Sequence, residues 1–278
     1  IGQGQATALK QIAAEVLGIP FEAVTVTWGD TIAPHTGDQV ASSTTMMTGN
    51  AVMLAAEDAK KKLLEAASKA LRQAPEELEI ENGMVMVKET PEKAMSVAAV
   101  VQLPGVKVIT GIGQWSITDE QASPRSMVAC IAEVAVDTET GKVEVTDMVQ
   151  GTDCGRAISK ARVEGQMDGV LSGGLGYILT EEWAMDQEDH GRILNLNLYD
   201  YKMPTTLDTK GILRPNIIME YPDEIGPFGA RGMGEATLSA SAPAILNAVY
   251  NAIGIRFQET PLTSDKVLNA IKNKDVLK

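Results

Sequence analysis

Hydrophobic residues recur along the chain with two periods, and the longer period predicts helices. Apolar side chains at helical spacing predict helices over Gln5–Leu17, from Thr48 to about Leu71, and over Ser159–Thr180. A further helix is expected from Ser241, as N-cap, to Gly254, with Pro243 in its first turn. The glycines of the third segment predict close backbone packing, because glycine is otherwise a costly helix residue.

The shorter period predicts strands and hairpins. Phe21–Trp28 alternates and contains enough β-branched residues to predict a strand. Leu78–Val87 predicts a hairpin, since the Asn-Gly pair at its centre tolerates positive φ. Met127–Val136 and Lys142–Gly151 predict a second hairpin. Antiparallel hairpins favour an α+β fold over a doubly wound parallel sheet, so we expect two lobes, each a mixed or antiparallel sheet with helices packed on one face.

The length of 278 residues, 44% of them hydrophobic, is enough for two such lobes. We expect a first lobe over residues 1–108 and a second over 109–278, with the segment Leu103–Pro124 at their boundary. The C-terminal helix could pack back on the first lobe. The chain starts without Met, at what looks like the end of a strand, so we interpret it as a fragment or a split subunit.

Composition excludes several classes of protein. A formal charge of −13 repels phosphate backbones and argues against nucleic acid as the principal partner. No segment approaches the roughly 20 apolar residues of a membrane-spanning helix, and no signal peptide opens the chain, so the cytoplasm is the expected location. The two cysteines and two histidines lack the spacing of a zinc site, and we expect no metal-ligating side chain.

Two glycine-rich loops could carry chemistry. The first, Gly2-Gln3-Gly4 at a helix start, is either a structural turn or a phosphate site, and Thr7 stands where a dinucleotide fingerprint needs a third glycine. The second loop has four glycines over residues 226–234 and places Glu235 close to an expected helix start. Glu235 could present a base to a ligand, or it could merely complement the helix dipole.

Three further features allow two interpretations each. Arg231 is either a surface cation or an anion clamp, and the polar run from Ser42 to Thr45 is either a cofactor loop or the entry to a helix. Cys154 could be a reactive thiol, but a buried structural cysteine is favoured. Asp153 lies two residues before Gly155 in an expected turn after a strand, which favours backbone capping over catalysis.

Five ordered blocks, spread over nearly the whole chain, resemble the molybdopterin-binding subunit of the xanthine dehydrogenase and aldehyde oxidoreductase family, in its carboxy-terminal half. The blocks are Gly2-Gln3-Gly4 with Thr7; Ala41-Ser42-Ser43 with Gly49-Asn50-Ala51-Val52; Val136 to Val143; Asp153 to Ile158 with Glu164-Gly165-Gln166; and Gly226 to Glu235 followed by Ala242 to Ala248.

The resemblance implies roles for individual residues. Glu235 matches the glutamate of the family's Gly-x-Gly-Glu block and would be the base beside molybdenum, with Gly232 and Gly234 lining the pocket. Other matched positions would contact the pterin or the metal's oxo and sulfido groups: Gln3, Gly4, Ala41, Ser42, Ser43, Thr44 and Gln166. The cofactor brings its own dithiolene sulfurs, which is consistent with the scarcity of Cys and His.

The resemblance also implies an activity and partners. It implies a molybdenum hydroxylase that inserts oxygen from water into an N-heterocycle of the purine or nicotinate type, or into an aldehyde. The pterin could carry cytosine dinucleotide, and Fe–S and FAD groups on partner subunits or domains would take the electrons. The amino-terminal half of the molybdenum subunit would complete the pocket, and an exposed apolar patch could support a homodimer. The alternative is a non-catalytic module for molybdopterin binding or assembly.

Overall fold

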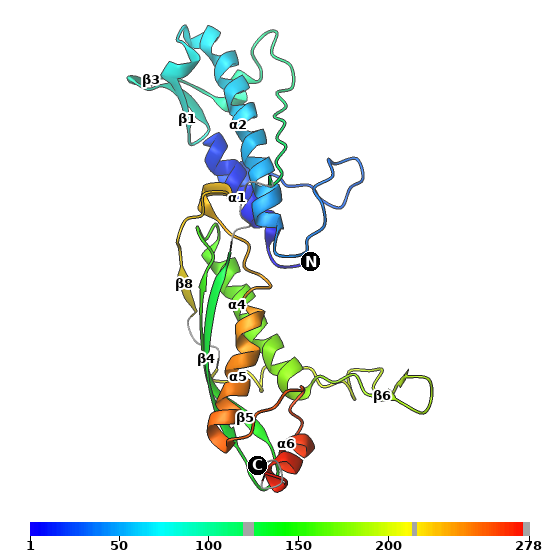
Figure 1. Ribbon diagram of the computed structural model, residues 1–278. Helices are drawn as coiled ribbons and strands as arrows, with labels where there is room; N and C mark the ends of the chain where they lie inside the picture. The colour runs from blue at the N-terminus through cyan, green and yellow to red at the C-terminus, as the bar shows by residue number, and fades with distance from the viewer. Residues whose placement is uncertain (119–124, 213–215, 275–278) are drawn as a thin grey trace. The chain divides into compact units, whose positions relative to one another are not determined.

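The computed structural model describes residues 1–118, 125–212 and 216–274, and the chain folds into two compact units (Figure 1). Unit 1 consists of Ile1–Arg125, Gly155–Ser159 and Tyr221–Gly232. Unit 2 consists of Ser126–Cys154, Lys160–Glu220 and Met233–Lys278. The predicted boundary segment Leu103–Pro124 lies partly outside the described residues, and the division at residues 108 and 109 stays a prediction.

Unit 1 combines helices with an antiparallel sheet of order β1-β2-β3. Its helices and strands are α1 (Gln5–Leu17), α2 (Thr44–Leu71), β1 (Leu78–Glu81), β2 (Met84–Val87), β3 (Thr90–Ser96) and α3 (Val97–Val100), with short 3₁₀ turns at Phe21–Ala23, Pro75–Glu77 and Pro227–Gly229. The prediction of α1 is confirmed to the residue, and Gly18 ends the helix at φ 67°. The first hairpin is also confirmed, with Asn82 and Gly83 at positive φ.

The predicted strand over Phe21–Trp28 is wrong. Phe21–Ala23 forms a 3₁₀ turn, and the residues after it are not part of any sheet. Alternation and β-branching favour an extended backbone, but a strand also requires a neighbouring strand to pair with. The pattern therefore predicts the local conformation of this segment and not its pairing.

The core of unit 1 lies between α2 and the sheet β1-β2-β3. Leu63, Ala67 and Leu71 recur on one face of α2 and pack against Leu78 and Val85 of the first hairpin. Burial of each of these leucine and valine side chains contributes about 1.5–3 kcal/mol. α2 begins four residues earlier than predicted, because the Ser43 carbonyl already accepts the Met47 amide at 2.8 Å.

Unit 2 contains a mixed sheet of order β4-β5-β8, in which β4 and β5 are antiparallel and β5 and β8 are parallel. Its elements are β4 (Met127–Val136), β5 (Val143–Asp153), α4 (Lys160–Leu175), a π-helix (Gly176–Thr180), β6 (Met185–Asp186), β7 (Arg192–Ile193), β8 (Ile217–Met219), α5 (Leu238–Ile253) and α6 (Ser264–Lys272). The second predicted hairpin is thus confirmed as β4 and β5.

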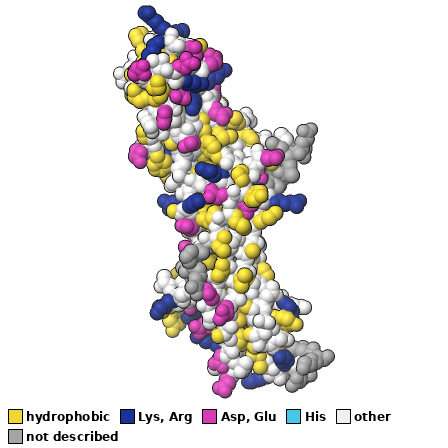
Figure 2. Space-filling model, turned by 90° about the vertical axis from the view of Figure 1, so that its left-hand side faces the viewer, with side chains coloured by type: hydrophobic (Ala, Val, Ile, Leu, Met, Phe, Trp, Pro, Cys, Tyr) yellow, Lys and Arg dark blue, Asp and Glu magenta, His cyan; other side chains and the backbone are white. Residues whose placement is uncertain are grey.

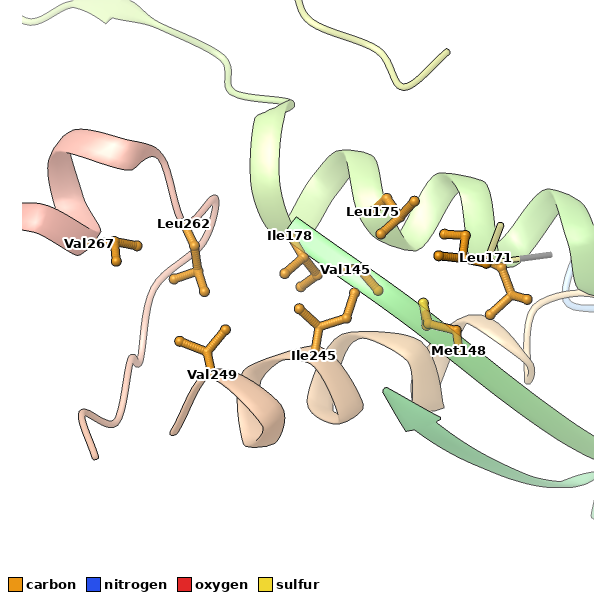
Figure 3. Close-up of a cluster of buried hydrophobic side chains, with 10 residues drawn as sticks. Val145, Met148, Leu171, Leu175, Ile178, Ile245, Val249, Leu262 and Val267 are labelled. Carbon is orange, nitrogen blue, oxygen red and sulfur yellow. The ribbon is translucent and has the colours of Figure 1, made fainter. Parts of the chain in front are cut away.

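The core of unit 2 joins this sheet to the helices on one of its faces. Figure 3 shows Val145 and Met148 of β5 beside Leu171 of α4 and Ile245 of α5. Val267 of α6 is fully buried in the same cluster. The α+β fold class, with helices packed on one face of mixed or antiparallel sheets, is therefore confirmed.

The start of α5 differs from the prediction. The helix begins at Leu238 with Thr237 as N-cap, so Ser241 and Pro243 lie inside it. The Ser241 hydroxyl donates to the Leu238 carbonyl at 3.1 Å, which is a bond within the helix and not a cap. The predicted end at Gly254 is confirmed, with φ 69°.

The glycines of α4 only partly match the predicted close packing. A Cβ at Gly174 would lie 2.5 Å from the Ser241 hydroxyl, so α4 and α5 approach closely there. Nothing lies within 4 Å of a Cβ built at Gly165, Gly169 or Gly173. A Cβ at Gly176, in the π-helix that follows, would overlap the Glu181 carboxylate. The prediction is therefore correct at Gly174 and Gly176 and wrong at the other three positions.

The second face of the sheet β4-β5-β8 carries exposed apolar side chains, beside the acidic pair Glu133 and Asp147. Ile131 is 75% exposed, and its register partner Val149 shares that face. Met127, Ile217 and Met219 are also exposed. On the side drawn in Figure 2, hydrophobic side chains lie exposed among charged ones. Among the described residues, no helix combines the length and the apolar composition needed to cross a membrane.

Candidate functional site

In unit 1, two helices start side by side. The side chain of Gln5, at the start of α1, donates to the Thr45 hydroxyl at the start of α2 over 3.2 Å. Neither helix start has a side-chain cap, and Gly4 precedes α1 with φ 87°. Gln3 donates to the side chain of Gln39 at 2.7 Å, in the loop that leads to α2. Uncapped helix starts present backbone N–H groups and a positive dipole end, which suit an anionic group.

The loop before α2 contains an unusual backbone conformation. Ala41 and Ser42 follow one another with φ values of 54° and 53°. Positive φ costs a residue with a Cβ roughly 1–2 kcal/mol, so surrounding contacts must hold the pair. Two of the contacts are bonds to the Val40 carbonyl, from the Ser43 hydroxyl at 2.8 Å and from the Ser43 amide at 3.2 Å.

The second glycine-rich loop packs onto this region within unit 1. A Cβ at Gly232 would overlap the Ser42 carbonyl oxygen, so only glycine permits the observed approach. The buried Asn50 side chain of α2 donates to the Ile225 carbonyl at 2.9 Å. Gly49, one residue earlier, leaves room for Pro227. The residues read from sequence as the start of α2 therefore hold the glycine-rich loop.

Arg231 is bound to a carboxylate inside this loop. Its Nε donates to Asp223 at 3.1 Å, and both side chains are only 14% exposed. Its Nη1 also donates to the Arg125 carbonyl at 3.1 Å. A partly buried ion pair of this kind orders the loop, because removing one partner would leave the other charge buried. Arg231 is thus not the freely solvated surface cation of the first interpretation.

In unit 2, Glu235 lies exposed in a turn that leads into α5, between the buried residues Met233 and Thr237. Gln166 is half-buried in α4. The helices α4 and α5 meet at Gly174 and Ser241. In the sequence, Gln166 comes before Gly174 in α4, and Glu235 comes before Ser241 of α5.

The predicted site residues thus fall into two groups. In unit 1 the structure brings Ser42 against Gly232, and the same unit holds Gln3, Gly4, Ala41, Ser43 and Thr44. In unit 2 it places Gln166, Gly234 and Glu235.

Sequence reasoning missed the residues that hold these segments in place. Asn50 follows Thr48 at the expected start of the second helix, and Gln150 belongs to no motif. Gln150 is 1% exposed in the middle of β5, and its side chain donates to the Thr237 carbonyl at 2.7 Å. The available signal was the position of Gln150 in the strand alternation, two residues after the buried Met148, because buried polar side chains usually have a specific partner.

The cysteines and acidic residues form no additional centre in the described part of the chain. Cys154 is 2% exposed, as the structural interpretation predicts, and Asp153 is also buried. Burial raises the pKa of the Cys130 thiol to about 11. Among the described residues, no group of three or more His, Cys, Asp or Glu side chains could hold a metal ion.

Together, the α+β fold, the paired uncapped helix starts and the glycine-rich loops are the features of a cofactor-binding domain. Residues 1–210 match the molybdopterin cofactor-binding domain family. Because this match covers more than half of the chain, the chain belongs to that family.

Curated relatives align over almost the whole chain. The probable hypoxanthine oxidase XdhD of Escherichia coli K12 is 32% identical over 98% of this chain and 28% of the relative. The nicotine 6-hydroxylase large subunit of Paenarthrobacter nicotinovorans is 32% identical over 98% of this chain and 34% of the relative. The chain therefore spans about a third of the length of these relatives.

Solved structures agree with this alignment. Quinoline 2-oxidoreductase from Pseudomonas putida 86 superimposes with a TM-score of 0.81 at 28% identity, over 98% of this chain and 35% of the other. Aldehyde oxidoreductase from Desulfovibrio gigas gives a TM-score of 0.75 at 26% identity, over 98% of this chain and 28% of the other.

Proposed function

We propose that this chain is part of a molybdenum hydroxylase that inserts oxygen from water into an aromatic N-heterocycle of the purine or nicotinate type, or into an aldehyde. The names of the relatives support this range, since they refer to hypoxanthine, nicotine, quinoline and aldehydes. The observation that carries the proposal is the exposed Glu235 at the end of the second glycine-rich loop, in a chain that belongs to a molybdopterin-binding family.

The residues of unit 1 fit the anionic part of such a cofactor. The uncapped starts of α1 and α2, with Gly4 before the first helix, offer backbone N–H groups to a phosphate. Ala41 and Ser42 are held at positive φ, and Gly232 allows the glycine-rich loop to reach Ser42. In unit 2, nothing lies within 4 Å of a Cβ at Gly165, so the backbone beside Gln166 is open to a bound group.

When bound, the cofactor supplies the oxygen-transfer and two-electron redox chemistry. The chain's own contribution is a base. The Glu235 carboxylate accepts the proton that is released when oxygen is transferred to the substrate, and Gln166 donates a hydrogen bond that orients the bound group. A base of this kind must lie within about 2.6–3.2 Å of the atom that loses the proton. Gly234, directly before Glu235 in the chain, adds no side-chain bulk beside the carboxylate.

Partners complete the proposed enzyme. They are the amino-terminal half of the molybdenum subunit, an Fe–S subunit and an FAD subunit, and the pterin carries cytosine dinucleotide. The open face of the sheet β4-β5-β8, with Met127, Ile131 and Ile217 exposed, supports a contact with another chain or with a second copy. The cytoplasmic location stays a prediction.

A second candidate applies to the chain by itself. Because it spans about a third of the length of its relatives, the isolated chain could act only in molybdopterin binding or assembly. Addition of the missing partner chain separates the two functions. A hydroxylase component gains cofactor and turnover, whereas an assembly module gains no turnover.

The role of Glu235 is tested in the full complex with Glu235→Gln, which keeps the size of the side chain and removes the base. We expect kcat to fall by a factor of at least about 100, the lower range of general-base contributions, with unchanged molybdenum content. Glu224→Gln is the matched control, because Glu224 is another exposed carboxylate in the segment leading to the loop. Near-normal turnover of Glu235→Gln would contradict the assigned role.

A further inference from the structure

The turn that carries Glu235 is closed by Thr237. The Thr237 amide donates to the Met233 carbonyl at 3.4 Å, and the Thr237 hydroxyl donates to the Gly234 carbonyl at 3.1 Å. Thr237 is fully buried and Met233 is nearly so, while Glu235 between them is exposed. The two buried ends of the turn therefore determine where the backbone of Glu235 lies.

Gln150 connects this turn to the centre of the sheet in unit 2. Its Nε2 donates to the Thr237 carbonyl at 2.7 Å, across 87 positions of the sequence. Gln150 is 1% exposed and lies in β5 between the buried residues Met148 and Thr152. A strand at the centre of its sheet is a rigid support, because β4 and β8 pair with it on either side.

A buried glutamine costs more free energy at position 150 than an apolar side chain that only fills the space. Its Oε1 is buried and has no hydrogen-bond partner among the described residues. Burial of an unpaired amide oxygen destabilises a fold, and an apolar side chain of similar size would avoid that cost. The amide is explained if its Nε2 bond to Thr237 has a use beyond stability.

We propose that Gln150 and Thr237 are positioning residues that hold the Glu235 carboxylate for proton transfer. The proposal rests on the proposed function, in which Glu235 is the base. The Thr237 hydroxyl holds the Gly234 carbonyl, directly before Glu235. Gln150 holds the carbonyl of Thr237, two residues after Glu235. Neither residue touches the substrate; both restrict the directions in which Glu235 can point. Such restriction matters because a displacement of about 1 Å can lower a rate by about 100-fold.

The test uses Gln150→Met and Thr237→Val in the full complex. Each replacement keeps the approximate volume and removes the hydrogen bond. We expect kcat to fall by about 10- to 100-fold, with KM changed less than about threefold and molybdenum content unchanged. Thr237→Ser, which retains the hydroxyl, should recover most of kcat. Thr152→Val is the matched control, since Thr152 is equally buried in β5 but donates to the Met127 carbonyl instead of the turn.

Two readouts separate positioning from a merely structural role. Hydrogen exchange of the segment 233–238 should become faster in Gln150→Met, while the urea midpoint stays at or above that of the wild type, because the unpaired oxygen is removed. In the Glu235→Gln background, Gln150→Met should lower kcat no further, because both changes act through one carboxylate.

The outcomes are distinguishable. If Glu235→Gln itself keeps turnover, the proposed function fails and the positioning role falls with it. If Glu235→Gln loses turnover but Gln150→Met and Thr237→Val do not, the positioning proposal alone is wrong. An equal loss of kcat from Gln150→Met in the presence and absence of the Glu235 carboxylate also overturns it.

Discussion

Gly173 and Gly174 are neighbours in α4, but alanine should stabilise the fold at Gly173 and should not stabilise it at Gly174. A Cβ at Gly174 would lie 2.5 Å from the Ser241 hydroxyl and 3.0 Å from the Ser241 Cβ, both in α5. A Cβ at Gly173 would have nothing within 4 Å. The contact matters for the site because α4 carries Gln166 and α5 follows Glu235.

The magnitude follows from two terms. Alanine in a helix interior is favoured over glycine by about 1 kcal/mol, and this gain is common to both variants. Overpacking at Gly174 costs about 1–3 kcal/mol, because Ser241 is buried and α4 or α5 must shift. Gly173→Ala should therefore raise the free energy of unfolding by about 1 kcal/mol. The free energy of unfolding of Gly173→Ala should exceed that of the Gly174→Ala variant by about 1–3 kcal/mol.

Urea denaturation followed by circular dichroism measures this difference. With a slope of about 2 kcal/mol/M, the two midpoints should differ by about 0.5–1.5 M at equal slope. Ser241→Ala in the Gly174→Ala background should recover part of the loss, since the hydroxyl is the nearest atom. Equal midpoints for Gly173→Ala and Gly174→Ala would refute the close contact between α4 and α5.

Three other predictions test separate parts of the chain. Gly232→Ala should destabilise unit 1 by about 1–3 kcal/mol, because its Cβ overlaps the Ser42 carbonyl; an unchanged thermal midpoint would contradict this packing. A hydrogen bond from Thr140 holds the pKa of Asp137 below its usual value, so Asp137→Ala should lower stability above about pH 4. The loss should disappear as pH falls through the folded-state pKa. Denaturation midpoints between about pH 2 and 7 measure this, and a pH-independent loss would contradict it. Because burial raises the pKa of Cys130 to about 11, its alkylation by iodoacetamide at pH 8 should be about 100-fold slower than that of a free thiol. Mass spectrometry measures the two rates of alkylation, and equal rates would refute the burial of Cys130.

Local signals in the sequence predicted much of the fold. The spacing of apolar residues and the glycine at position 18 were sufficient for α1, and the Asn-Gly pair was sufficient for the hairpin of β1 and β2. Phe21–Trp28 shows where such signals fail, because pairing depends on a distant neighbour that the pattern does not identify. Element type is thus readable from local chemistry, while sheet membership is not.

Errors at the helix starts have the same origin. Gly49 and Asn50 resemble start signals, yet they lie inside α2, where the glycine makes room for Pro227 and the asparagine bonds to Ile225. Ser241 resembles an N-cap, yet it packs against Gly174 inside α5. In each case a tertiary contact, invisible in a single segment, explains the residue type.

The candidate site was predictable only as far as its motifs. The glycine-rich loop identified Glu235, but the residues that hold its turn, Gln150 and Thr237, come from segments 87 positions apart. Likewise, the Arg231 partner Asp223 had no sequence signal beyond its charge. Roles of this kind depend on three-dimensional proximity and require the structure.

The central claim is that this chain binds a molybdenum cofactor, and the most direct test is the molybdenum and pterin content of the protein purified from its native host together with its partners. We expect about one molybdenum and one pterin per chain, with activity lost on cyanide treatment. A complete partner complex that contains neither molybdenum nor pterin would contradict it, and the catalytic role of Glu235 would have to be abandoned.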